Sequence, residues 1–395
     1  MKRVLYVCPE FPVNPDSGGK KVFFKNLVSL VNSDYISHLD CVFLDVDLKS
    51  TIDDFPLHIK CNGRFFLFER NGKKAEQLTL VEKLFSFVRY VFNSNPRFVH
   101  VRDNPNAKNE IKALIERNNY DVIISDHLAS YALINDYADS VTHISHNIEG
   151  DIFIDRFKYT KGIERCFSLI ELFKTKRLER KIYGRFKNIY FLSDFDKSRA
   201  ENIFGLNNTK LGSFVIPFHD IGVDVSQNKK NIVFIGGEGY FPNKEAIEWI
   251  CNELAPLTHD ISYQVIGGNN KLSNTYKHVS NVHFLGFLSE ELLTETVRNA
   301  RLMISPVIFG SGIKIKVVEA LSYGLPCFCT IESMKGIEIR DGCKPFDRNR
   351  PIAEIADELE ALINNSTELK KMSSSIVNFY AENKRNLITD IIKDS

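Results

Sequence analysis

The stretch SPVIFGSGIKIKVVEALSYGLP, residues 305–326, decides how this 395-residue chain is interpreted. Its pattern predicts a buried strand, a glycine loop, a helix that carries two lysines and a glutamate, and a Gly-x-Pro turn. A glycine loop at the N-terminus of a helix offers backbone N–H groups and the positive end of the helix dipole to an anion. The stretch therefore predicts an anion site, with the backbone of Gly310, Ser311, Gly312 and Ile313 as its cradle.

Three charged side chains accompany this loop. Lys314 and Lys316 add positive charge beside it, although both could instead extend along the exposed face of the helix. Glu319 follows Gly312 by seven residues, about two helical turns at 3.6 residues per turn, so its carboxylate returns to the same face. There it could accept two neighbouring hydroxyls, such as those of a ribose; the alternative is a solvated charge on an amphipathic helix. A diphosphate cradle beside such a carboxylate indicates a nucleotide-sugar site.

This arrangement resembles the donor site of retaining glycosyltransferases with the GT-B fold, in the large family called group 1 or family 4. The segment IVFIGGEGYFPNKEA at 232–246, followed by Trp249, resembles the opening of the family's C-terminal domain. VHFLGFL at 282–288 resembles the strand and turn whose backbone faces the nucleobase, and 330–337 resembles the stretch after the Gly-x-Pro turn. The resemblance covers about residues 230–345, and it implies further donor contacts at these positions: Gly236, Gly237, Phe287 and Leu288.

The chain departs from the family pattern at two places. The family usually has a second glutamate eight residues before the one that matches Glu319, and this chain has Ser311 there. The arginine and lysine that often follow the first strand of the C-terminal domain are also replaced, by Gly237 and the pair Glu238-Gly239. The resemblance then leaves the charge of the diphosphate to Lys314 and Lys316.

Composition excludes several classes of protein. With 44% hydrophobic and 26% charged residues the chain is globular, and 395 residues predict two domains. The 51 Lys and Arg nearly equal the 50 Asp and Glu, which argues against a nucleic-acid partner. We see no signal sequence and no apolar run near 18 residues, so we expect a cytoplasmic protein. The eight cysteines lack the spacing of a zinc site, and Cys327 and Cys329 are interpreted as core.

Alternating strand-like and helix-like segments predict parallel sheets built from βαβ units, hence an α/β fold. With the resemblance, this becomes the GT-B architecture of two Rossmann-like domains facing across a cleft. We expect an acceptor-binding domain, a linker, a nucleotide-sugar-binding domain and a C-terminal helix that packs back on the first domain, at 1–218, 219–231, 232–372 and 373–395. The expected strands are 4–8, 39–44, 65–68, 121–125, 142–145, 189–192, 214–217, 232–235, 263–266, 283–285, 302–305 and 326–329, and the expected helices include 20–31, 352–364 and 368–392.

The first half supplies candidates for the acceptor side. Gly18 and Gly19 lie between the first strand and the first helix, where the resemblance implies an approach to the donor phosphates; the alternative is a flexible turn. His146 follows a strand and matches a family histidine that approaches the transferred sugar, with Glu149 beside it as a carboxylate that could orient an acceptor. Asp126, followed by His127, is placed in the same way and could orient or deprotonate an acceptor hydroxyl. Each of these residues could instead cap the next helix.

The resemblance implies a front-face mechanism in which the leaving diphosphate accepts the proton of the acceptor, with His146, Lys316, Asp126 and Glu149 as the candidate catalytic residues. No carboxylate nucleophile for double displacement stands out. We expect no cofactor beyond a UDP- or GDP-linked sugar as donor substrate, and no metal: the Asp-x-Asp at 45–47, far from the donor motifs, is interpreted as a surface turn.

The segment 156–187 has eleven Lys and Arg against three Asp and Glu, together with apolar residues at helical spacing. Basic amphipathic helices lie on anionic membranes, which would suit a lipid-linked glycan acceptor at the inner face of the cytoplasmic membrane. The alternative is a solvated helix that buttresses the first sheet.

Three classes of function remain open. The first is a retaining glycosyltransferase that acts on a glycan or a lipid-linked glycan, by analogy in the synthesis of surface polysaccharide. The second is a GT-B-like nucleotide-sugar 2-epimerase, which needs no acceptor. The third is a non-catalytic partner subunit of a transferase, which the serine at position 311 keeps open.

Overall fold

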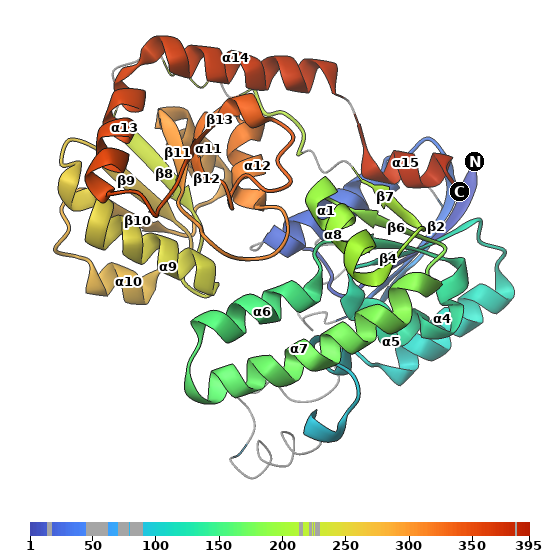
Figure 1. Ribbon diagram of the computed structural model, residues 1–395. Helices are drawn as coiled ribbons and strands as arrows, with labels where there is room; N and C mark the ends of the chain where they lie inside the picture. Colours follow the sequence, from blue (N-terminus) through green and yellow to red (C-terminus); the bar gives the residue numbers. More distant parts are fainter. Residues whose placement is uncertain are drawn as a thin grey trace. The chain divides into compact units, whose positions relative to one another are not determined.

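The protein forms two compact units in a computed structural model (Figure 1). The structure describes residues 1–13, 18–44, 62–69, 79, 90–212, 216–220, 223, 225, 230–383 and 385–395. Unit 1 comprises Met1–Phe214 with Arg385–Ser395, and unit 2 comprises Val215–Lys384. The Asp-x-Asp triplet at 45–47 lies outside the described residues, as do parts of the expected linker and of the expected strand 214–217.

Unit 1 is built on a parallel sheet in which the described strands follow the order β3-β2-β1-β4-β5-β6-β7. Its strands are β1 Lys2–Cys8, β2 Ile36–Phe43, β3 Phe65–Leu67, β4 Val122–Asp126, β5 Val141–Ser145, β6 Asn188–Phe191 and β7 Thr209–Leu211. The central strands β4 and β5 are buried along their whole length, and β1 is buried from Val4 onward, because helices cover both faces of such a sheet. The helices are α1 Gly18–Val31, α3 Arg97–His100, α4 Pro105–Arg117, α5 Tyr131–Ile134, α6 Glu149–Tyr159, α7 Gly162–Ile182, α8 Asp194–Phe204 and α15 Leu387–Lys393.

Unit 2 repeats this design with the strand order β10-β9-β8-β11-β12-β13, again parallel. Its strands are β8 Asn231–Ile235, β9 Ser262–Ile266, β10 Val282–Gly286, β11 Leu302–Ser305, β12 Cys327–Thr330 and β13 Cys343–Phe346. One core surrounds its sheet, with the ring of Phe328 stacked on Phe346 at 4.3 Å between centroids. The helices are α9 Phe241–Trp249, α10 Asn270–Thr275, α11 Glu290–Asn299, α12 Ile315–Ser322, α13 Ile352–Asn364 and α14 Ser366–Glu382.

The α/β prediction is confirmed, with corrections at the edges. The edge strands β7 and β13 were not predicted, because β7 is short and β13 contains Pro345, which sheets tolerate only at an edge. The helix predicted over 368–392 is wrong as a single element: α14 ends at Glu382 and α15 begins at Leu387. Asn386 marks this break, because its side chain accepts the Ile388 and Thr389 N–H groups and so caps a new helix.

The last helix, α15, belongs to unit 1. Its residues Leu387, Ile388, Ile391 and Ile392 are buried there. The Asp394 carboxylate, just after α15, accepts hydrogen bonds from Tyr190 and Lys210 at 2.7 and 3.0 Å. The C-terminal residues thus complete the core of the N-terminal unit.

We predict that Ile391→Ala lowers the free energy of unfolding by about 2–5 kcal/mol, since it removes fully buried methyl groups. The measurement is urea denaturation followed by far-UV circular dichroism. The matched control is Val377→Ala on α14, an exposed site where the same kind of truncation should cost under about 0.5 kcal/mol. Equal costs for the two variants would contradict the placement of α15.

Candidate active site

Both sheets have a point where the strand order reverses, and ligands of open α/β sheets bind outside the carboxyl ends of the strands at such a point. In unit 2 the reversal lies between β8 and β11, and the loops that follow these strands carry Gly236-Gly237 and the glycine loop 306–314. The donor residues predicted from the sequence therefore come together at the position that the topology favours.

The glycine loop is held by one buried ammonium. Lys314 Nζ donates to the carbonyls of Gly310 and Gly312 at 2.6 and 3.0 Å, and it lies 3.5 Å from the Glu332 carboxylate. Gly310 and Gly312 have φ angles of 117° and 75°, which residues with a Cβ rarely adopt. Because a trans peptide points its N–H opposite to its carbonyl, the N–H groups of Ser311 and Ile313 face away from Lys314. Lys314 thus shapes the cradle from behind.

Lys316 lies in the first turn of α12, directly after the glycine loop. Its ammonium donates to Asn243 Oδ1 and lies 4.6 Å from the centroid of the Phe234 ring. Burial, with a smaller contribution from the Lys314 charge, lowers the pKa of Lys316 to about 7. An anion placed beside this ammonium would favour its charged form, since opposite charges stabilise each other.

The loop after β8 is built from close backbone contacts. Asn243 Nδ2 donates to Gly237 O at 3.3 Å, so one amide joins this loop to Lys316. A Cβ on Gly236 would lie 2.7 Å from that same amide, which explains the glycine. Asn269 donates to the carbonyls of Gly236 and Gly267 at 3.1 Å each.

The remaining predicted donor residues flank these loops. Glu319 lies on α12 with 8% of its surface exposed. Phe287 and Leu288 follow β10, and the Phe287 ring, 74% exposed, lies against Gly268, where a Cβ would approach it to 2.8 Å. The carboxyl ends of β8, β9 and β10 thus form a glycine-lined surface beside the cradle.

In unit 1 the strand order reverses between β1 and β4. Gly18 and Gly19 form the first turn of α1, which follows β1. A Cβ on Gly19 would meet nothing within 4 Å, so packing in the structure does not explain this glycine.

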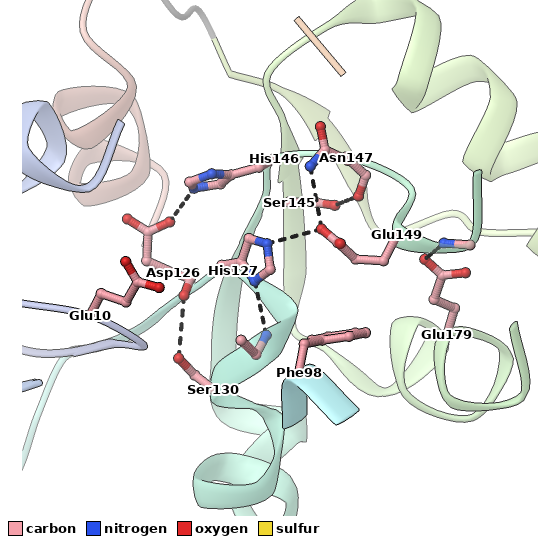
Figure 2. Close-up of polar contacts among 12 residues, drawn as sticks. Glu10, Phe98, Asp126, His127, Ser130, Ser145, His146, Asn147, Glu149 and Glu179 are labelled. Carbon is pink, nitrogen blue, oxygen red and sulfur yellow. Dashed lines mark hydrogen bonds and ion pairs between the residues drawn. The ribbon is translucent and has the colours of Figure 1, made fainter. Parts of the chain in front are cut away.

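Asp126, the last residue of β4, is fully buried and binds partners from three other segments; Figure 2 shows its contact with His146. One carboxylate oxygen lies 2.6 Å from His146 Nε2, and the other accepts from Tyr6 Oη at 2.6 Å and Asn26 Nδ2 at 2.8 Å. Burial alone would raise the pKa of Asp126, but His146 and the two donors outweigh it and the net pKa is lowered. The ionised carboxylate therefore fixes the His146 ring.

A second histidine–carboxylate pair crosses between the same two strand ends. His127 Nε2 lies 3.0 Å from Glu149 Oε1, and His127 Nδ1 accepts the Ala129 N–H (Figure 2). Burial would lower the pKa of His127, but the Glu149 charge outweighs it and the net pKa is raised. His127 has a φ of 67°, the one positive value among the described non-glycine residues. Strained backbone of this kind gathers at functional sites.

Glu179 of α7 lies beside the start of α6, close to Glu149 (Figure 2). One carboxyl oxygen accepts the Gly150 N–H at 3.2 Å, and the other is buried without a hydrogen-bond partner. Burial, reinforced by the charges of Glu149 and Asp151, raises the pKa of Glu179 to about 8. A protonated carboxyl is therefore the form that this site holds near neutral pH.

The structure brings together the predicted residues Asp126, His146 and Glu149, and it adds partners that the sequence analysis did not name. Tyr6 lies inside the apolar run of β1, and Asn26 occupies a buried position of α1. A polar residue at a core position is the signal that could have found both, because buried polar groups need partners. Asn243 on α9 is also a buried polar residue that the sequence analysis did not name, and the same signal could have found it.

Comparison with known proteins agrees with this geometry. Residues 229–365 match the family model described as Glycosyl transferases group 1. Comparison with curated proteins found no match.

The fold is also similar to solved structures over nearly the full chain, each at 12% identity. S. aureus TarM in complex with fondaparinux, alpha-GlcNAc-glycerol and UDP gives a TM-score of 0.66, covering 100% of this chain and 98% of that one. WaaG, a glycosyltransferase involved in lipopolysaccharide biosynthesis, gives 0.62 with 99% of both chains. Anabaena HepE in complex with UDP and glucose gives 0.59 with 100% and 98%.

These similarities show the fold alone: it is the GT-B fold of two α/β units, as expected from the motifs. Residues 229–365, which match the family model for group 1 glycosyl transferases, include most of the segment in which the sequence resemblance lies. Among the described helices, none is long and apolar enough to cross a membrane.

We predict that Glu179→Gln flattens the dependence of stability on pH. In the unfolded chain the carboxyl ionises near its ordinary pKa of 4.5, whereas in the fold it stays protonated up to about pH 8. Between these values the unfolded state binds fewer protons, so stability falls as pH rises, by up to about 1.4 kcal/mol per pH unit, and levels off above about 8.

The measurement is urea denaturation at a series of pH values across this window. The variant should lose this component of the slope, whereas Glu116→Gln at an exposed site of α4 should keep the wild-type slope. Parallel curves for wild type and Glu179→Gln would show that Glu179 is ionised in the fold.

Proposed function

We propose that the protein is a retaining glycosyltransferase that moves a sugar from a nucleotide-diphosphate sugar to a glycan or lipid-linked glycan acceptor. The observation that carries the proposal is the glycine cradle beside Lys316 at the β8/β11 reversal, within the segment matched by the glycosyltransferase family model. TarM and HepE, which share the fold, were solved with UDP. WaaG acts in lipopolysaccharide biosynthesis, which supports a role in surface polysaccharide by analogy.

The donor diphosphate would bind to the N–H groups of the glycine loop and the Lys316 ammonium, with the ribose hydroxyls on Glu319 and the base along 286–288. Lys314 would act from behind the loop, because its ammonium is engaged by two loop carbonyls and Glu332. No carboxylate nucleophile is assigned. The leaving diphosphate would itself accept the acceptor proton, and the cradle would stabilise the charge that develops on it. We propose that this chemistry needs no metal.

In unit 1, His146 would contact the transferred sugar, and Gly18 and Gly19 would let the donor phosphates approach the start of α1. Because Asp126 engages His146 Nε2, the sugar contact falls to Nδ1. Asp126 is fully buried and both of its oxygens have partners, so we assign it the positioning of His146 and not the deprotonation of an acceptor. Glu149 would orient an acceptor only on exchanging its contact with His127.

The decisive experiment is thermal unfolding of the wild type with UDP, GDP and ADP, with Glu319→Gln as the test variant. A nucleotide at one hundred times its dissociation constant adds about 2.7 kcal/mol of stability, a shift of a few degrees for domains of this size. We expect one nucleotide to stabilise the wild type and the exposed control Glu295→Ala, and to lose most of its effect on Glu319→Gln. Unfolding without nucleotide confirms that each variant is folded.

Incubation with the matching nucleotide sugar, with and without an acceptor, separates the two enzymatic alternatives, and the thermal unfolding series tests the third. A 2-epimerase interconverts the matching nucleotide sugar and its 2-epimer without an acceptor. A transferase instead releases free nucleotide when it glycosylates an acceptor. A partner subunit that only supports another transferase would show no change of unfolding temperature with any nucleotide, in the wild type or in Glu319→Gln. That last result would exclude donor binding and with it the proposed activity.

We also propose that α7 contacts an anionic membrane surface. The basic segment is two helices, α6 and α7, and not one. Its apolar residues divide: Leu178 is buried, while Ile163, Leu169 and Phe173 are 87%, 50% and 74% exposed on α7. Eleven cations against three anions in 156–187 complement a negatively charged surface.

We predict that the protein sediments with vesicles containing anionic lipid at low salt and is released at high salt. The double variant Ile163→Ser/Phe173→Ser should lose most of this binding, since exposed apolar side chains anchor such helices. The matched control is Leu292→Ser, an exposed leucine of α11. Vesicle binding that is insensitive to salt and to both α7 substitutions would assign it to another surface.

A further inference from the structure

Three cysteines that are scattered in the sequence lie together in unit 2. The sulfur atoms of Cys327, Cys329 and Cys343 all lie within 4.8 Å of one another, and the seven described cysteines are free thiols. Cys327 and Cys329 project to one face of β12, because side chains alternate along a strand. Cys343 on β13 is the register partner of Cys327. The cluster is therefore fixed by sheet pairing.

The sulfur spacing suits a single metal ion. A tetrahedral Zn²⁺ with Zn–S bonds of about 2.3 Å holds its sulfurs about 3.8 Å apart, so the three thiols would each need to move by roughly half an ångström. Thiolates are the ligands that soft and borderline metals select. Three converging thiols at this spacing exceed what core packing requires.

The surroundings favour a divalent ion. Three thiolates leave one net negative charge around a divalent metal and two around a monovalent one. The Tyr380 hydroxyl on α14 is buried without a hydrogen-bond partner and senses the charge of Cys327. It is therefore a candidate donor to a thiolate sulfur.

A path to the cluster exists at Cys343. A cavity of about 270 Å³ borders this cysteine, and its other lining residues are Arg340, Asp341, Lys344, Glu368, Lys371, Met372 and Ser375. Its polar lining thus carries both acidic and basic side chains; the elements β13 and α14 on which Cys343 and Glu368 lie are labelled in Figure 1. Cys343 keeps 7% of its surface exposed, whereas Cys327 and Cys329 are fully buried. An ion can thus approach from the cavity side, where water or a cavity side chain would complete its coordination.

We propose that Cys327, Cys329 and Cys343 form a structural site for a thiophilic divalent cation of the Zn²⁺ class. Binding replaces three S–H bonds by three metal–sulfur bonds and releases three protons to solvent, with no change of oxidation state. The site lies behind the glycine loop, since Cys329 precedes Thr330, whose hydroxyl donates to the Val307 carbonyl at the start of that loop. Its role is to fix β12 and β13, and it needs no contact with the donor.

The test uses the full chain with Cys166→Ser, which removes an exposed thiol of α7. The reduced protein, freed of metal by a chelator, is titrated with Cd²⁺ as a spectroscopic probe and then challenged with Zn²⁺. We expect one equivalent bound, an ultraviolet thiolate-to-metal charge-transfer band, release of about three protons, and an unfolding temperature raised by several degrees. Zn²⁺ in large excess should compete with Cd²⁺ for the same site, because thiolates bind the softer Cd²⁺ more tightly.

Two further substitutions in the same background make the result specific. Cys343→Ser should weaken Cd²⁺ binding by more than the roughly 10–100-fold that loss of a supporting outer-shell group costs. Cys251→Ser, a buried cysteine of the same unit outside the cluster, should keep the wild-type affinity. Unfolding of the metal-free variants confirms their fold, and Cys329→Ser replaces Cys343→Ser if the latter does not fold. No uptake, uptake undiminished in the cluster variant, or a disulfide in place of metal binding would overturn the proposal.

Discussion

Parallel pairing of the strands is the constraint on which the rest of this structure depends. Because each pairing in the described sheets is parallel, the carboxyl ends of the strands meet at one edge of each sheet. The loops that leave this edge are thereby gathered although they lie far apart in the chain. At the two points where the strand order reverses, adjacent loops diverge and leave room for a ligand.

Buried charged side chains at these edges join neighbouring loops to one another. Asp126 joins the end of β4 to Tyr6, Asn26 and the loop after β5, and Lys314 draws two carbonyls of the glycine loop towards Glu332. Buried charged pairs add little net stability against an apolar replacement, but removal of one partner costs about 3–5 kcal/mol. Their effect here is on geometry: they hold the loops in one arrangement that a donor or acceptor could meet.

The sequence predicted the central strands and the edge strands β3 and β10. It missed the edge strands β7 and β13 and the break before α15. β1, β4, β8 and β11 contain apolar runs between turn signals, and this local pattern suffices to identify them. The edge strands β7 and β13 carry Lys210 and Pro345 and lack such a run. An edge strand pairs with a neighbour on one side only, so it tolerates a charged residue or a proline that lacks an N–H group. The break before α15 depends on one capping side chain, Asn386, inside a pattern that otherwise continues.

The sequence by itself determined the α/β class, the glycine cradle and the carboxylate two turns beyond it, because periodicity, glycine conformation and helix spacing are properties of neighbouring residues. Only the tertiary structure decided that Lys314 turns into the loop, that Asp126 holds His146, and that Cys343 joins Cys327 and Cys329. Partners of this kind can lie far apart in the chain: Tyr6 and Asp126, for example, are separated by 120 residues. Their meeting is set by the order of strands in a sheet, and no local pattern specifies that order.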